Sequence, residues 1–197
     1  MLDRARKLVE SVKANSFPEL GGADIRPRLF HGRGDYFRAR FSVHRLLFGR
    51  PMRYYVGVNP AAFESGVAEG AARAIVAHEL CHILYFERAG RLELLMLMRL
   101  LSKNFTARFE RLTDLEAIVR GYGEGLSEYR EWLYRNVPPE KLAEKRRNYF
   151  SPAEIAAVQA LTARRPELCT RWRANIPLTL EEITASTAPR AGHVPSG

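Results

Sequence analysis

Two histidines and a glutamate at close spacing are the residues of this chain best suited to chemistry. His78 and His82 lie four residues apart, with Glu79 directly after the first, in the stretch AIVAHELCHILYFERAG. On a helix this spacing puts both imidazoles on one face, one turn apart, where they could hold one Zn²⁺. Glu79 would lie beside the metal without binding it, where it could hold a water molecule and take its proton.

A histidine pair on a helix can also be ordinary hydrogen-bonded core. Two observations favour a metal. The neighbouring residues are apolar, and two imidazoles and a carboxylate buried among them would be costly without a partner. The chain also has only 5 histidines, and two of them fall in this register. We therefore predict one zinc ion per chain.

A catalytic zinc site needs a third protein ligand and an open fourth position. In the stretch NFTARFERLTDLEAIVRGYG, Glu110 and Asp114 share one face of a predicted helix. Glu110 could bind the metal, and Asp114 could accept the second ring N–H of a ligand histidine. The alternative is an exposed acidic pair beside arginines, but two histidines alone would leave the site incomplete. The other candidates for the third ligand are Asp114 itself, Glu116, Glu93, His31 and His44.

The residues upstream of the histidines predict strands. The runs YFRARFSVH and MRYYVGV alternate apolar and polar side chains, as half-buried strands do. Gly49 and Pro51 lie between the two runs, so we expect adjacent antiparallel strands in a long-looped hairpin. A third strand is expected around Leu29.

Helical patterns cover most of the remaining chain. Apolar spacing predicts helices over residues 2 to about 14, from near Val67 to Gly90, over roughly 91–101, and from about Thr106 to Leu133. Shorter helices follow, and one of them begins with a capping box of Ser151 and Glu154.

These elements predict an α+β fold of one domain. We expect a small, mostly antiparallel sheet whose edge strand lies over the helix of the two histidines, and a second helix that carries Glu110. The core would span residues 1–137, with a helical extension packed on it over 138–182. A polar tail rich in proline and glycine, 183–197, is expected to be disordered.

The composition excludes several other classes. Cys81 and Cys169 form neither a disulfide framework nor a cysteine zinc site. No apolar run is long enough for a transmembrane helix and the N-terminus does not resemble a signal peptide, so we expect a cytoplasmic protein. The net charge is +9. The segment from Arg26 to Arg53 contains eight arginines and a single acid, Asp35. Nucleic-acid binding is therefore a further hypothesis, although a basic surface is more often simply solvated.

The order of these elements resembles the gluzincin metallopeptidases, in which a strand, an HExxH helix and an ExxxD helix follow one another. The segment FERLTD, from Phe109 to Asp114, is similar to the FExxAD-type segment of the HtpX and CAAX prenyl-protease group, although Thr113 replaces its alanine. The run VGVNPAAFESGVAEGAARAIVAHELCHIL is similar to that group's approach to its active helix. The resemblance covers roughly residues 50–120, and this sequence has none of the transmembrane helices of that group.

This resemblance implies a zincin-like fold and zinc-dependent hydrolysis of peptide bonds in a peptide or protein. The ligands would be His78, His82 and Glu110. Glu79 would be the general base, and Asp114 would contact a ligand side chain without binding the metal. An edge strand would align an extended substrate by backbone pairing, through Tyr54, Tyr55, Val56, Gly57 and Val58. The candidates for stabilising charge on the attacked carbonyl oxygen are Arg120, Tyr122 and Tyr129. The alternative is a zinc-binding interaction protein without catalytic activity.

Overall fold

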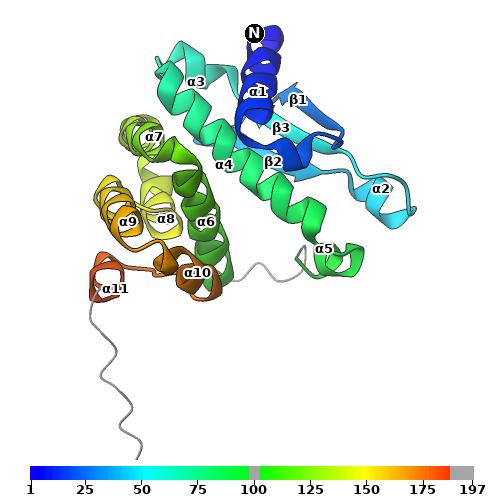
Figure 1. Cartoon of the computed structure of the whole chain (residues 1–197). Coiled ribbons are helices and arrows are strands. Elements are labelled where there is room, and N and C mark those ends of the chain that lie inside the picture. Colours follow the sequence, from blue (N-terminus) through cyan, green and yellow to red (C-terminus); the bar gives the residue numbers. More distant parts are fainter. Residues whose placement is uncertain (98–102, 187–197) are drawn as a thin grey trace, which may run out of the picture.

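The computed structural model describes residues 1–97 and 103–186, which form an α+β fold (Figure 1). In this part of the chain a single sheet of three strands contains β1 (Ile25–Leu29), β2 (Phe37–Phe41) and β3 (Tyr54–Val58) in the order β1-β3-β2. β3 pairs antiparallel with β2, as predicted, and parallel with β1. The sheet is therefore mixed, whereas the sequence predicted a mostly antiparallel one.

The position of β3 corrects the prediction that Tyr54–Val58 is the edge strand, because β3 lies in the centre of the sheet. Its sequence, YYVGV, carries no charge, and Tyr54, Val56 and Val58 are buried. The two flanking strands each carry two arginines, and charged side chains are typical of sheet edges. Alternation of apolar and polar residues predicts a strand but does not distinguish an edge from a centre.

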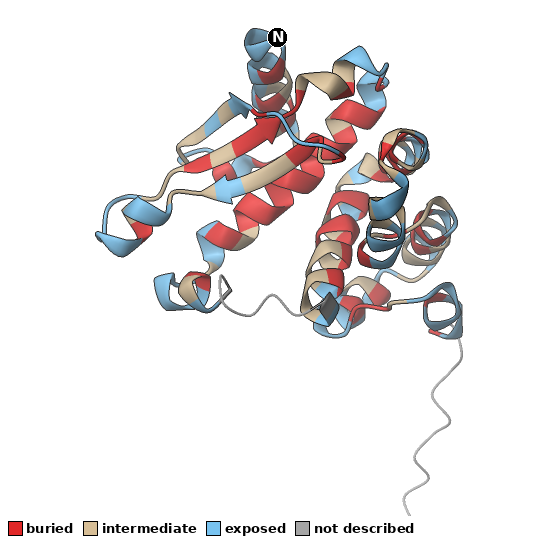
Figure 2. Cartoon of the chain, turned by 180° about the vertical axis from the view of Figure 1, so that it is seen from behind, coloured by how far each residue is buried: buried red, intermediate tan, exposed pale blue. Residues whose placement is uncertain are grey.

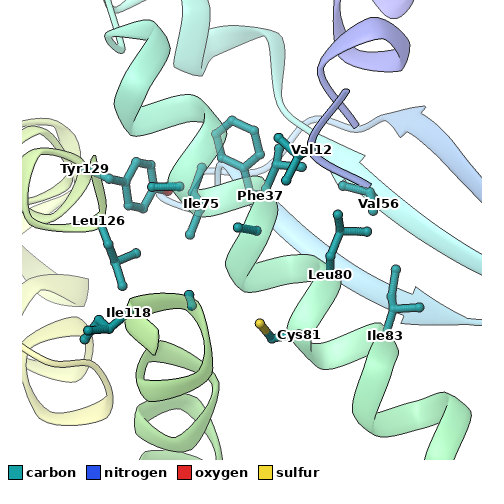
Figure 3. Packing of buried hydrophobic residues seen from close by; sticks show 14 of the residues in the cluster. Val12, Phe37, Val56, Ile75, Leu80, Cys81, Ile83, Ile118, Leu126 and Tyr129 are labelled. Carbon is teal, nitrogen blue, oxygen red and sulfur yellow. The ribbon is translucent and has the colours of Figure 1, made fainter. Parts of the chain in front are cut away.

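Two helices, α1 (Leu2–Ser16) and α4 (Glu69–Arg88), cover one face of the sheet (Figure 1). Leu80 and Ile83 extend from α4 toward the strands, while Ile118 and Leu126 approach α4 from its other side (Figure 3). A helix that is covered on both sides is apolar all round. This explains why the histidines of α4 lie in an apolar run and are buried.

The predicted helix over residues 106–133 is broken in its middle, which corrects that prediction. α6 (Lys103–Ala117) ends in a π-helical segment, Ile118–Tyr122, and α7 (Gly123–Asn136) follows. Gly121 has a φ of +88°, a conformation that glycine adopts far more readily than other residues. The bend brings both α6 and α7 against α4.

The shorter helices connect and cover these elements. The predicted capping box of Ser151 and Glu154 is confirmed at the start of one of them. The last of these helices, α11 (Leu180–Ala185), contradicts the predicted start of a disordered tail at residue 183, because it contains the fully buried Ile183. Residues 187–197, like the end of the predicted helix over 91–101, lie outside the described residues. The shorter helices are α2 (Val43–Leu47), α3 (Pro60–Glu64), α5 (Arg91–Leu97), α8 (Pro139–Asn148), α9 (Pro152–Arg164), α10 (Glu167–Ala174) and α11 (Leu180–Ala185), with a 3-10 turn at Pro18–Leu20.

The region beyond residue 138 packs on the preceding helices. α8 contacts α6, and α9 contacts α7. Arg111 of α6 and Glu154 of α9 form a buried ion pair with a separation of 2.8 Å. None of the described helices is long and apolar enough to cross a membrane.

Candidate metal centre

Three side-chain atoms from α4 and α6 form a nearly equilateral triangle. Nε2 of His78 lies 3.2 Å from Nε2 of His82 and 3.2 Å from Oε2 of Glu110, and the third side, from His82 to Glu110, is 3.1 Å. Zinc bonds of about 2.0–2.1 Å in a tetrahedral site place neighbouring ligand atoms about 3.3 Å apart. The described residues therefore contain a triad of the size that could hold a metal ion.

The far side of the His78 ring faces an acid. Nδ1 of His78 lies 2.8 Å from Oδ1 of Asp114, although the ring N–H is not well aligned on that oxygen. The acid favours a proton on Nδ1, which leaves the lone pair of Nε2 directed at the triangle. Asp114 therefore lies behind His78, on the side of the ring away from the triangle.

The far side of the His82 ring faces a hydroxyl. Oγ1 of Thr113 lies 3.3 Å from Nδ1 of His82 and donates its own proton to the carbonyl of Phe109 at 2.9 Å. Because that proton is already used, the hydroxyl oxygen can only accept from His82. Nδ1 of His82 then carries the proton, and Nε2 presents a lone pair.

These protonation states make the triangle a cluster of three acceptors. Two nitrogen lone pairs and a carboxylate converge at about hydrogen-bond distance without a donor between them. Such an arrangement is repulsive unless a proton or a cation lies among the three atoms. The donor set, two imidazoles and one carboxylate, suits zinc.

Asp114 is held by a buried network behind the triangle. Its Oδ1 accepts a hydrogen bond from Nη2 of Arg130 at 2.7 Å, and its Oδ2 accepts one from the backbone N–H of Phe150 at 2.9 Å. Burial alone would raise the pKa of Asp114, but the Arg130 guanidinium, His78 and the backbone N–H of Phe150 together outweigh this effect and keep that pKa below its usual value. The acid is therefore ionised at neutral pH, and it cannot be the exposed residue of the alternative interpretation.

The charges of the triangle stabilise one another without a metal. Burial disfavours the charged form of Glu110, but the two histidines outweigh it and lower the pKa of that carboxyl. Burial likewise lowers the pKa of His78, but Asp114 and Glu110 outweigh it and raise that pKa to about 9. In the metal-free protein, a proton on His78 therefore takes the place that a cation would take.

Glu79 lies beside the triangle but outside it. Its side chain is buried and lines the same cleft as His82 and Glu110. Burial raises the pKa of Glu79, and this effect exceeds the opposite effect of the two histidines. A raised pKa is the direction that a general base working near neutral pH needs. The backbone N–H of Ala39, on β2, contacts this carboxylate and lowers its pKa slightly.

A cleft of about 610 Å³ opens over the triangle between β2 and α6. Its polar lining residues include Glu79, His82, Glu110 and Tyr149. Aromatic rings also line the cleft, where Phe86 packs edge-on against Phe41 and lies 6.5 Å from Phe109 between ring centres. The remaining lining residues are Phe37, Arg38, Ala39, Arg40, Val43, Phe105 and Thr106.

The alternative third ligands are not in this cluster. Glu116 pairs with Arg173, and Glu93 accepts a hydrogen bond from Tyr85. The His44 ring packs against Phe48 at a tilt of 36°. The cluster of metal-binding groups among the described residues includes neither these three residues nor His31.

The proposed oxyanion candidates have other partners. Arg120 binds Glu19, and the Tyr122 hydroxyl contacts Ser16 Oγ at 2.7 Å. Tyr129 is buried against Trp132 and does not line the main cleft. None of these three residues reaches the cleft over the triangle.

Two residues that the sequence analysis missed lie at the site. Tyr149, between α8 and α9, lines the cleft, and its ring centre lies 5.8 Å from that of His78. Arg130 stacks over Tyr149 at 4.2 Å and also holds Asp114. Only one sequence signal could have indicated Arg130, namely an arginine on the buried face of α7.

Comparison of the chain with protein-family models, with curated proteins and with solved structures finds no match. The interpretation of the site therefore depends on its own geometry and chemistry.

Proposed function

We propose that this chain is a zinc-dependent peptidase of the gluzincin type. The observation that carries the proposal is the triangle of His78, His82 and Glu110, whose sides of 3.1–3.2 Å match one face of a zinc tetrahedron. Three protein ligands leave a fourth position, as in catalytic zinc sites. Glu79, which follows the first histidine, supports a catalytic rather than a purely structural role.

Each residue of the cleft would have a distinct role. A bound zinc would act as a Lewis acid and lower the pKa of water to about 7. Glu79 would take a proton from the attacking water and give it to the leaving nitrogen of the peptide bond. Asp114 and Thr113 would keep the two ligand imidazoles oriented.

Tyr149 is the residue best placed to donate a hydrogen bond to the attacked carbonyl oxygen. Burial, followed by the nearby Glu110 carboxylate, raises the pKa of Tyr149 well above its usual value, so its hydroxyl keeps the proton. A fixed donor aimed at developing negative charge stabilises the transition state. We assign this role to Tyr149 in place of the three candidates from the sequence.

The strand that would align the substrate is β2 rather than β3. The N–H of Ser42 donates to Arg53, and the N–H of Asn59 donates to the carbonyl of Tyr36. Because antiparallel pairs alternate, the main-chain groups of Phe37, Ala39 and Phe41 are then directed away from β3, toward the cleft. An extended peptide could pair with this edge beside Glu79.

The test is a cleavage assay on a pool of proteome-derived peptides, read by mass spectrometry. Zinc-loaded wild type should cleave peptides, and Glu79→Gln should keep its zinc but lose about 10²–10⁴-fold in rate. Glu69→Gln, an exposed position on the same helix, is the matched control and should behave as wild type. Retained zinc with no cleavage by wild type would contradict the proposal and favour a non-catalytic interaction protein.

A further inference from the structure

The second face of the sheet carries arginines in two rows. The register places Arg28 of β1 and Arg38 of β2 on either side of Gly57, and Arg26 and Arg40 on either side of Tyr55. α1 and α4 cover the opposite face, and no other described helix lies across this one (Figure 2). Four of the eight arginines between Arg26 and Arg53 therefore lie on one open surface.

Three of these four arginines have no acidic partner in the part of the chain that the structure describes. Arg26 pairs with Asp24 at 2.9 Å, whereas no carboxylate among the described residues lies within ion-pair distance of Arg28, Arg38 or Arg40. Neighbouring charges of one sign repel each other, and an anionic partner would relieve that repulsion.

The three arginines surround a hollow of about 220 Å³ above Gly57. The guanidinium carbon of Arg38 lies 3.7 Å from the ring centre of Phe30, and that of Arg28 lies 3.8 Å from the ring centre of Tyr55. A Cβ atom at Gly57 would lie 2.9 Å from Cγ of Arg38, so the glycine keeps the floor of the hollow open. The rings hold two guanidinium groups in place before any ligand binds, which reduces the entropy lost on binding.

The chemistry of this surface fits nucleic acid better than an acidic peptide. The basic residues of β1 and β2 are all arginine, whose planar fork matches phosphate oxygens in two places at once. Guanidinium planes also offer stacking surfaces to unpaired bases, which carboxylate side chains would not use.

We propose that this open sheet face binds single-stranded nucleic acid, with a backbone phosphate in the hollow between Arg28, Arg38 and Arg40. The activity is separate from the proposed peptidase chemistry, because none of the three triangle residues lines this hollow. Arg38 and Arg40 also border the cleft, so bound nucleic acid would lie next to the entrance of the substrate.

The experiment measures binding of fluorescently labelled oligo(dT) and oligo(U) of 20 nucleotides by anisotropy across a series of salt concentrations. The full chain is used, once with zinc and once with EDTA. With three phosphate contacts on a single strand, the slope of log Kobs against log[salt] should be about −2. The triple change Arg28→Gln, Arg38→Gln, Arg40→Gln should bring this slope close to zero. It should also weaken binding about tenfold or more at low salt.

The matched control removes the same charge elsewhere. Arg135, Arg164 and Arg171 are exposed on the helical side, and their triple change to Gln should alter affinity less than about twofold. Thermal unfolding of both triple variants checks that each remains folded. Equal losses in the two triple variants would overturn the proposal, as would no binding by wild type at 20 mM salt. Tighter binding of a duplex of the same length, or of poly-glutamate, would also overturn it.

Discussion

The hydroxyl of Thr113 lies 3.3 Å from Nδ1 of His82 while donating to the carbonyl of Phe109. The hydroxyl therefore fixes which ring nitrogen of His82 carries the proton. In the protease group that the sequence resembles, alanine occupies this position, so Thr113 replaces a residue that cannot make this contact. The difference adds a partner for the second histidine, as Asp114 does for the first.

Thr113→Val removes the hydroxyl and keeps the shape of the side chain. We expect zinc affinity to fall about tenfold, because partners behind metal ligands typically contribute 10–100-fold. Competition with a fluorescent chelator measures the affinity. Thr113→Ser retains the hydroxyl and should bind zinc as wild type does. Equal affinity in the valine variant would show that the contact does not orient His82.

The stability of the metal-free protein should fall as pH rises from about 6.5 to about 9. Burial lowers the pKa of His78, but Asp114 and Glu110 raise it to about 9, above the usual histidine value of 6.5. The folded state thus binds a proton that the unfolded state has lost in this range. The stabilisation is complete below about pH 6.5 and is lost through about pH 9.

Zinc should show the opposite trend, because it must displace that proton. The increase in unfolding temperature on adding zinc should grow from pH 6.5 to pH 8.5. Thermal unfolding in EDTA and in zinc at several pH values measures both effects. Metal-free stability that rises through this range would contradict the assignment of His78 as the proton-binding group.

Tyr149→Phe should lower kcat about 10²–10³-fold, the usual effect of removing one donor to a developing oxyanion. Zinc content and KM should change little, because the hydroxyl is assigned a contact that forms in the transition state. Tyr134→Phe, a nearby change of the same kind outside the cleft, is the control. A Tyr149→Phe variant with wild-type kcat would exclude the assigned role.

The sequence predicts the cluster of His78, His82 and Glu110 because its signals are local. His78 and His82 are related by one helical turn, and so are Glu110 and Asp114, so periodicity alone places each pair on one face. The contact between α4 and α6 depends on how the two helices pack, which periodicity does not show. The sequence indicated this contact only indirectly, because two histidines need a third ligand from another element to complete a zinc site.

The predictions that were wrong depend on contacts between distant segments. The central position of β3 is set by pairing with β1 and β2, which the pattern of Tyr54–Val58 does not contain. Tyr149 and Arg130 reach the site through the fold, and neither lies in a motif. The break at Gly121 did have a signal, the three closely spaced glycines of RGYGEG, which a long helix would not favour.

The most direct test of the metal centre is the zinc content of the purified chain by elemental analysis. Wild type should contain one zinc per chain. Glu110→Ala should contain much less while remaining folded, because it removes the third ligand. Glu116→Ala, on the same helix but paired with Arg173, should keep the zinc. No zinc in wild type after metal addition at neutral pH, or full zinc in Glu110→Ala, would contradict the three-ligand site.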